Sequence, residues 1–159
     1  MTTGFPRETG YTYDTLLELL TSQTDAVTDL TLANGSTVDM AAAGSGGNEN
    51  ADSEFKGDLV IDVSAIEVAT GDEVYTIVLN GSDNSDFTTG DQEELALIRI
   101  GDSSVFTGDV DSDAGRYVVP FSNKRNTRMY RYCRLEITIA GTIATGITWA
   151  AFIGKRKTG

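Results

Sequence analysis

The chain has 159 residues, a length typical of one domain, and its 40% hydrophobic content is enough for a core and too high for a disordered protein. It contains no histidine and one cysteine, so imidazole metal ligands, an ordinary Ser–His triad and an intrachain disulfide are excluded. The net charge of −12 opposes nonspecific binding to nucleic acid.

The first 22 residues are expected to form an N-terminal arm. Residues 1–12 lack the apolar stretch of a secretory signal, and no run in the chain is long enough to span a bilayer, so we expect folding in a cytoplasm and no membrane contact. Residues 13–22 are leucine-rich and contain Asp14 as an N-cap candidate. This pattern predicts one or two helical turns. Because so short a helix is unstable alone, Leu16, Leu17 and Leu20 are candidates for burial against a partner subunit.

The next part of the chain has the pattern of strands and turns. Apolar residues in 26–33 are followed by Asn34-Gly35-Ser36, which predicts a turn, and residues 41–57 predict a long polar loop. Residues 59–68 alternate and then slip in phase, which indicates a bulge or bend. Thr70-Gly71-Asp72-Glu73 predicts a hairpin leading into a strand over 74–80.

The remaining strands are expected at 94–100, 117–121, 129–140 and 146–154, with Pro120 at an edge or strand end. Seven or eight strands without a long helix between them predict an all-β, antiparallel jelly roll or β-sandwich of about eight strands over 23–154. Residues 155–159 form a basic C-terminal tail. The expected core comprises Leu59, Ile61, Val63, Ile77, Leu79, Leu97, Leu135, Ile137, Ile139 and Phe152.

The segment 108–115, GDVDSDAG, is the sharpest local motif. Asp109, Asp111 and Asp113 alternate like the first ligands of a calcium loop, but the sixth position is Ala114 rather than Gly and the twelfth is Pro120 rather than Glu. A solvated turn is therefore the favoured interpretation, with a metal site as the weaker alternative. The loop 82–86, SDNSD, has the same two interpretations.

Nothing in the sequence predicts an enzyme or a cofactor. Acidic pairs such as Glu93 with Glu94 are adjacent on strands, so their side chains point to opposite faces and are poor candidates for glycosidase carboxylates. No P-loop, dinucleotide fingerprint or nucleophile elbow is present. Cys133 lies in an apolar run and is expected to be a buried hydrophobe rather than a reactive thiol.

The charge is divided unevenly along the chain. Residues 1–123 carry 23 acidic and 4 basic side chains, whereas residues 124–159 carry 8 basic and 1 acidic. Tyrosine and arginine in 124–134 favour a protein contact over nucleic-acid stacking. Either the basic residues pair with acidic neighbours in the same chain, or Arg125, Arg128 and Arg131 face an acidic surface of a partner.

The order of these segments is similar to that of a known protein family. The sequence leads from a Leu-rich start through VTDLTLANGS and a Gly-rich loop to LVIDVSAIEVATGDEVYTIVLNGSDN, and closes with RYCRLEITIAGTIATGITWAAFIGKRK. This resembles the cement proteins that decorate the capsids of tailed bacteriophages, in particular the Bordetella-phage type. The resemblance covers most of residues 13–154, while the acidic 41–54 loop and the basic tail depart from the pattern.

The resemblance implies a jelly-roll subunit made in a bacterial host cytoplasm and seated on the outer face of the virion capsid. Its implied partners are the major capsid protein and itself, with a homodimer expected and a trimer left open. The alternative is a non-catalytic carbohydrate- or calcium-binding β-sandwich module of a phage fibre. That alternative predicts exposed aromatic side chains, whereas Trp149 lies in an apolar run and is expected in the core.

Overall fold

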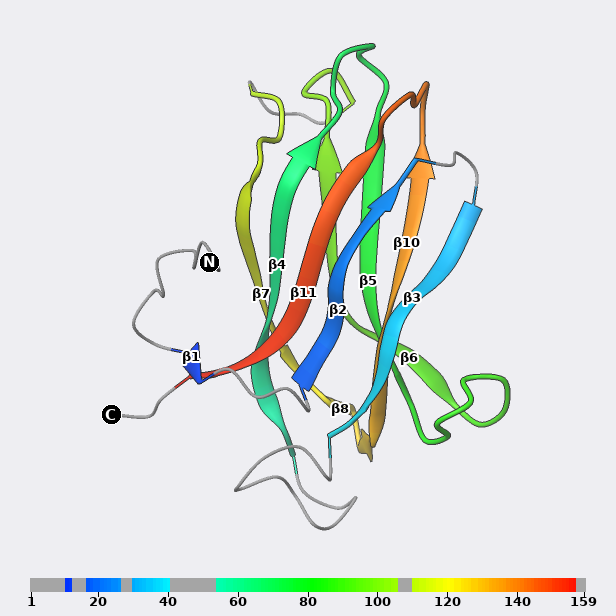
Figure 1. Ribbon diagram of the computed structural model, residues 1–159. Helices are drawn as coiled ribbons and strands as arrows, with labels where there is room; N and C mark the ends of the chain where they lie inside the picture. The colour runs from blue at the N-terminus through cyan, green and yellow to red at the C-terminus, as the bar shows by residue number, and fades with distance from the viewer. Residues whose placement is uncertain (1–10, 13–16, 27–29, 41–53, 106–109, 157–159) are drawn as a thin grey trace.

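The computed structural model describes residues 11–12, 17–26, 30–40, 54–105 and 110–156, and the regular secondary structure of these ranges is almost entirely β-strand (Figure 1). No α-helix occurs in these ranges. The long strands are β2 (Glu18–Asp25), β3 (Leu30–Asp39), β4 (Lys56–Ile66), β5 (Val74–Ser82), β6 (Gln92–Gly101), β7 (Gly115–Ser122), β10 (Tyr132–Ala140) and β11 (Ile147–Arg156). Two-residue strands are β1 (Tyr11–Thr12), β8 (Lys124–Arg125) and β9 (Arg128–Met129).

The long strands form two antiparallel sheets packed face to face. One has the order β2–β11–β4–β7, with β1 pairing farther along β11, and the other has the order β3–β10–β5–β6. Each connection between consecutive long strands crosses from one sheet to the other, except the hairpin that joins β5 to β6. This arrangement is a jelly roll, which confirms the predicted fold class.

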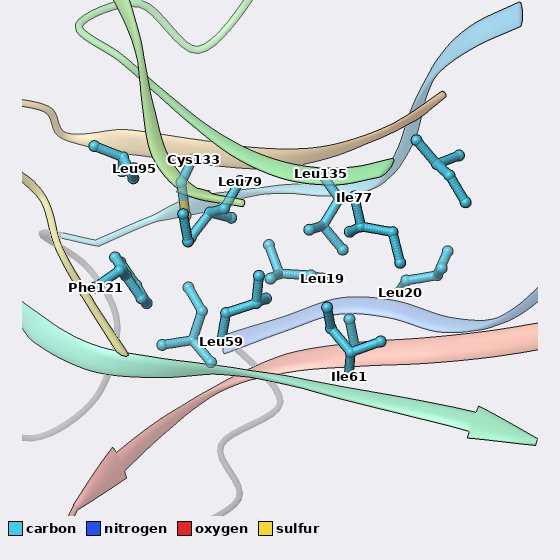
Figure 2. Packing of buried hydrophobic residues seen from close by; sticks show 14 of the residues in the cluster. Leu19, Leu20, Leu59, Ile61, Ile77, Leu79, Leu95, Phe121, Cys133 and Leu135 are labelled. Carbon is cyan, nitrogen blue, oxygen red and sulfur yellow. The ribbon is translucent and has the colours of Figure 1, made fainter. Parts of the chain in front are cut away.

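The core fills the space between the sheets (Figure 2). Leu59, Ile61, Val63, Ile77, Leu79, Leu135, Ile137 and Ile139 are buried as predicted. Phe152 is half-buried and lies on the outer side of β11, where the Arg116 guanidinium carbon is 5.7 Å from its ring centre. Trp149 and Cys133 are fully enclosed, as expected for core residues.

Two predicted core residues are wrong: Phe152 faces outward from β11, and Leu97 has 41% of its surface exposed. A register shift in β6 opposes Leu79 with Ala96 and Asn80 with Glu94, so Leu95 is an extra residue in the ladder. Both Leu95 and Ala96 face the core, and the alternation beyond them is reversed. The bulge therefore turns Leu97 outward.

The helical turns expected over 13–22 are wrong for the described part of that segment. Glu18–Asp25 is strand β2, which pairs with β11. Leu17, Leu19 and Leu20 belong to the buried core, as Figure 2 shows for Leu19 and Leu20. Leu17 and Leu20 are therefore buried within their own chain and not, as had been expected, against a partner subunit. Leu16 lies outside the described residues. The sandwich accordingly begins inside the segment 1–22, and β11 extends into the expected tail through Arg156.

Two predicted turns also differ from the structure. Asn34-Gly35-Ser36 is an irregularity within β3 rather than a turn, and a Cβ on Gly35 (φ +77°) would lie 1.7 Å from the Leu19 carbonyl oxygen. Glycine is needed there because β3 passes this close to β2. Thr70-Gly71-Asp72-Glu73 does not close a hairpin, since β4 and β5 belong to different sheets.

Candidate functional site

The basic segment after β7 lies at one end of the sandwich, and its arginines contact groups of the same chain. Arg131 donates from Nε and Nη2 to the two carboxylate oxygens of Asp39, at 3.0 and 2.7 Å. This bidentate contact raises the pKa of Arg131 above its ordinary value. The pair ties the start of β10 to the end of β3, where Met40 N also donates to the Arg131 carbonyl at 2.9 Å.

Arg128 and Arg125 are also engaged within the chain. Arg128 forms an ion pair with Asp91, and both side chains are at least half exposed. Arg125 donates from Nε to the Glu94 carbonyl at 3.1 Å and from Nη2 to the Leu95 carbonyl, so it covers the bulge of β6. Arg128 and Arg131 thus pair with acidic side chains of the same chain, as the internal interpretation expects, whereas Arg125 binds backbone carbonyls.

Arg134 holds the loop between β5 and β6 against the outer face of its sheet. Its guanidinium carbon lies 4.4 Å from the ring centre of Phe87, a cation–π contact, and Nη2 lies 3.5 Å from Glu136 Oε1. Phe87 is buried although its φ is +53°, a left-handed conformation that a bulky residue rarely adopts. The stacking on Arg134 stabilises this conformation.

Asn123 anchors the β8–β9 hairpin to the sandwich. Its Oδ1 accepts from Phe55 N at 2.7 Å, and its Nδ2 donates to the Tyr130 carbonyl at 3.1 Å. Its backbone N and O bond the same two residues. The side chain is buried and joins three segments, a role that sequence reasoning missed because a lone Asn in a turn carries no distinctive signal.

Carboxylates occupy the opposite end of the sandwich, where they bind backbone N–H groups. Glu73 is fully buried and accepts from Thr70 N and Oγ1 at 2.6 Å, from Gly71 N at 2.9 Å and from Asp72 N at 3.0 Å. Burial opposes its ionisation, but these hydrogen bonds outweigh burial and lower its pKa to about 2. Glu73 is thus an ionised, solvent-shielded anchor of the β4–β5 connection.

Glu67 and Asp72 link that connection to the one between β10 and β11. Glu67 Oε2 accepts from the backbone N–H groups of residues 144, 145 and 146 at 2.9, 2.6 and 2.8 Å. Asp72 accepts from Thr142 N at 2.8 Å and Thr142 Oγ1 at 2.9 Å. These hydrogen bonds lower the pKa of both carboxyls. Both are structural acceptors; Asp72 follows Gly71 in a turn-like sequence, whereas Glu67 lies between Ile66 and Val68 and has no local sequence signal.

The predicted Asp-rich calcium candidate does not assemble in the described residues. Asp109 lies outside them, Asp111 accepts from Ser103 N at 2.9 Å, and Asp113 is exposed. No group of three or more Asp, Glu or Cys side chains in the described ranges is arranged to hold a metal ion. In the other candidate loop, Asp86 accepts from Thr88 N at 2.8 Å and so closes its own turn. The solvated-turn interpretation agrees with these contacts.

The two residues with distinctive side-chain chemistry are enclosed. Burial raises the pKa of the Cys133 thiol, and the residue has no exposed surface. Trp149 donates from Nε1 to Asp25 Oδ2 at 2.8 Å and joins β11 to β2. A buried thiol with a raised pKa is a poor nucleophile, and an enclosed indole cannot stack on a ligand.

Comparisons with known proteins leave the fold and these contacts as the basis for any functional argument. No family model, curated protein or solved structure matches the chain. Among the described residues there is no helix of the length and hydrophobicity that a membrane span requires.

Proposed function

We propose that this chain is a non-catalytic structural protein of a bacteriophage virion, which binds the outer surface of the major capsid protein lattice and stabilises the head. The observation that carries the proposal is the jelly-roll strand order, an architecture that recurs in viral capsid proteins. The resemblance of the sequence to cement proteins of tailed phages supports it.

The use of the polar side chains also supports a structural role. Glu67, Asp72 and Glu73 hold loops, and Arg125 and Arg131 hold strands. A protein that stabilises a lattice needs a rigid scaffold and many weak, repeated contacts rather than reactive groups. The fibre-module alternative gains no comparable support, because Trp149 is enclosed in the core.

Co-sedimentation with empty shells tests the proposal. Shells assembled from the major capsid protein encoded in the same genome are mixed with the purified chain, pelleted, and heated with and without it. We expect saturable binding at a fixed ratio to the capsid subunit and a higher melting temperature of the shell. Absence of the chain from pelleted shells and from native virions would overturn the proposal.

Salt and charge variants then test how the chain binds the shell. Lys124 is exposed and Arg128 is half exposed beside it, so the double variant Lys124→Gln/Arg128→Gln removes accessible charge without touching Arg125 or Arg131. If this end of the sandwich faces the capsid, the variant leaves the shell at lower salt than the parent. Lys56→Gln, whose side chain is 74% exposed, removes a charge from the same end, because Lys56 lies opposite Ser122 at the end of β7, and it should also lower the salt resistance. Equal salt resistance of all three proteins would show that this end does not bind.

A further inference from the structure

Strand β6 forms an edge of its sheet, and part of that edge has no hydrogen-bond partner among the described residues. On one side of the sandwich, β2 and β3 lie against each other, as the approach of Gly35 to the Leu19 carbonyl shows. On the other side, β6 and β7 also approach each other across the sandwich, and β7 carries Pro120, which has no N–H to offer a further strand. β6 ends its sheet and pairs with β5 alone among the described strands.

Both ends of this edge are covered, but its middle is open. Arg125 binds the Glu94 and Leu95 carbonyls at one end, and Ser112 binds Gly101 at the other, with Ser112 N donating to the Gly101 carbonyl at 2.9 Å. Because backbone groups alternate in direction, the N–H and C=O of Leu97 also point to this edge. Among the described residues, no group forms a hydrogen bond with this N–H or this C=O.

The side chains around the open segment have a self-complementary pattern. The bulge at Leu95 puts Glu94, Leu97 and Arg99 at successive outward positions, opposite Asn80, Val78 and Thr76 of β5. All three are exposed. The exposed large hydrophobics of the described chain, Leu97, Val105, Val110 and Val118, lie on β6, on β7 or between them. An acidic, an apolar and a basic position thus follow one another along an unpaired strand.

We propose that β6 pairs with β6 of a second copy of this chain, antiparallel about a two-fold axis at Leu97. In this arrangement Leu97 meets Leu97 of the second copy, and Arg99 lies opposite Glu94 of the second copy on both sides of the axis. The contact is isologous, as a two-fold dimer requires. It joins the two β3–β10–β5–β6 sheets at their edges and covers the open middle of each edge, between the carbonyls that Arg125 and Ser112 bind.

A cysteine at the axis tests the geometry directly. Directly opposed residues in a hydrogen-bonded antiparallel pair have Cα atoms about 5.5 Å apart, within the span of a disulfide. The variant Leu97→Cys should therefore form a covalent dimer under mild oxidation that reverts with reductant. The native Cys133 has no exposed surface and does not compete. The control is Val118→Cys on β7, which is exposed to a similar extent and should stay monomeric on a non-reducing gel.

Charge exchange tests the register in solution without cross-linking. By sedimentation equilibrium, Glu94→Arg and Arg99→Glu should each weaken the dimer about tenfold, because each places like charges opposite one another twice per dimer. The double variant restores opposite charges and should return to parental affinity, with circular dichroism confirming the fold of each protein. A monomeric parent, a double variant no tighter than the singles, or cross-linking of Val118→Cys instead of Leu97→Cys would overturn the proposal. These measurements use the isolated chain, so they succeed or fail independently of capsid binding.

Discussion

At the scale of single residues, carboxylates are used mainly as acceptors for backbone N–H groups. The Asp-rich motif drew attention as a possible ligand set, but the carboxylates with the most extensive hydrogen bonds are Glu67 and Glu73, which close connections at the same end of the sandwich. A carboxylate with three or four N–H and O–H donors is stabilised in its ionised form. The rigidity of this end therefore depends on keeping these groups charged.

The free energy of unfolding should fall in acid, and part of this fall should come from protonation of Glu73. The pKa of Glu73 is lowered from an ordinary 4.5 to about 2, so its contribution is complete above about pH 4.5 and is lost as the pH falls towards 2. At pH 7 the variant Glu73→Gln should lose about 1–3 kcal/mol of unfolding free energy, because an amide N–H₂ opposes backbone donors. In urea titrations the gap between parent and variant should narrow between pH 7 and pH 2.5.

The exposed Glu93→Gln substitution is the matched control for this experiment, and it should change the unfolding free energy by less than about 0.5 kcal/mol. A gap between the parent and Glu73→Gln that stays constant over this pH range would contradict the assigned role of Glu73.

At the scale of elements, edge strands are held by specific side-chain contacts. Strand β2 pairs along one side with β11, and its last residue, Asp25, accepts a hydrogen bond from Trp149 Nε1 in the core. At the other edge, Arg125 covers the bulge of β6. In each case a polar side chain from a neighbouring element fixes a strand that has a single ladder partner.

Removing the Asp25 carboxylate should loosen β2. The variant Asp25→Ala leaves the enclosed Trp149 N–H without its partner, which costs about 1–3 kcal/mol. Thermal unfolding followed by tryptophan fluorescence should show this loss, and amide exchange should rise first in β2. Ser22→Ala, an exposed change in the same strand, should unfold like the parent. Equal melting temperatures for Asp25→Ala and the parent would show that the contact adds no stability.

Much of the fold, but little of the polar architecture, was predictable from the sequence. Alternating apolar residues identified β4, β6 and β10, because a strand with one buried face must alternate. Leu-rich β2 was predicted as helix, since two adjacent leucines both face the core through register shifts in its pairing with β11. The prediction that Leu97 lies in the core was wrong for a similar reason, because a bulge moves every later side chain of the strand to the other face. Which N–H group a carboxylate binds depends on connections from distant segments, so it was not readable locally.

At the scale of the whole molecule, both sheets share one core. Side chains from β2, β4 and β11 pack directly against those from β5 and β10, as Figure 2 shows for Leu19, Leu59 and Leu135. The basic segment and the carboxylate-held loops lie at opposite ends of this single body. Loss of either sheet would expose the apolar face of the other, so neither can persist alone.

Equilibrium unfolding should therefore be a single cooperative transition. Trp149 reports the β11 side of the core, while far-UV circular dichroism reports all strands, and the two urea curves should coincide. The midpoint should also rise with protein concentration if the copies associate through β6, since association stabilises the folded state by mass action. Separate midpoints for the two probes would contradict a shared core.

The position of β11 has a consequence for biosynthesis. This strand is the last in sequence, yet it lies inside its sheet, between β2 and β4, with Ile147 opposite both Asp25 and Ile66. Until the ribosome has released β11, β2 lacks its ladder partner and β4 pairs with β7 alone, so the two parts of this sheet are not joined. At about 5–20 residues per second, the nascent chain remains without its completed sandwich for on the order of ten seconds, and it is during this interval that chaperones have access to its apolar strands.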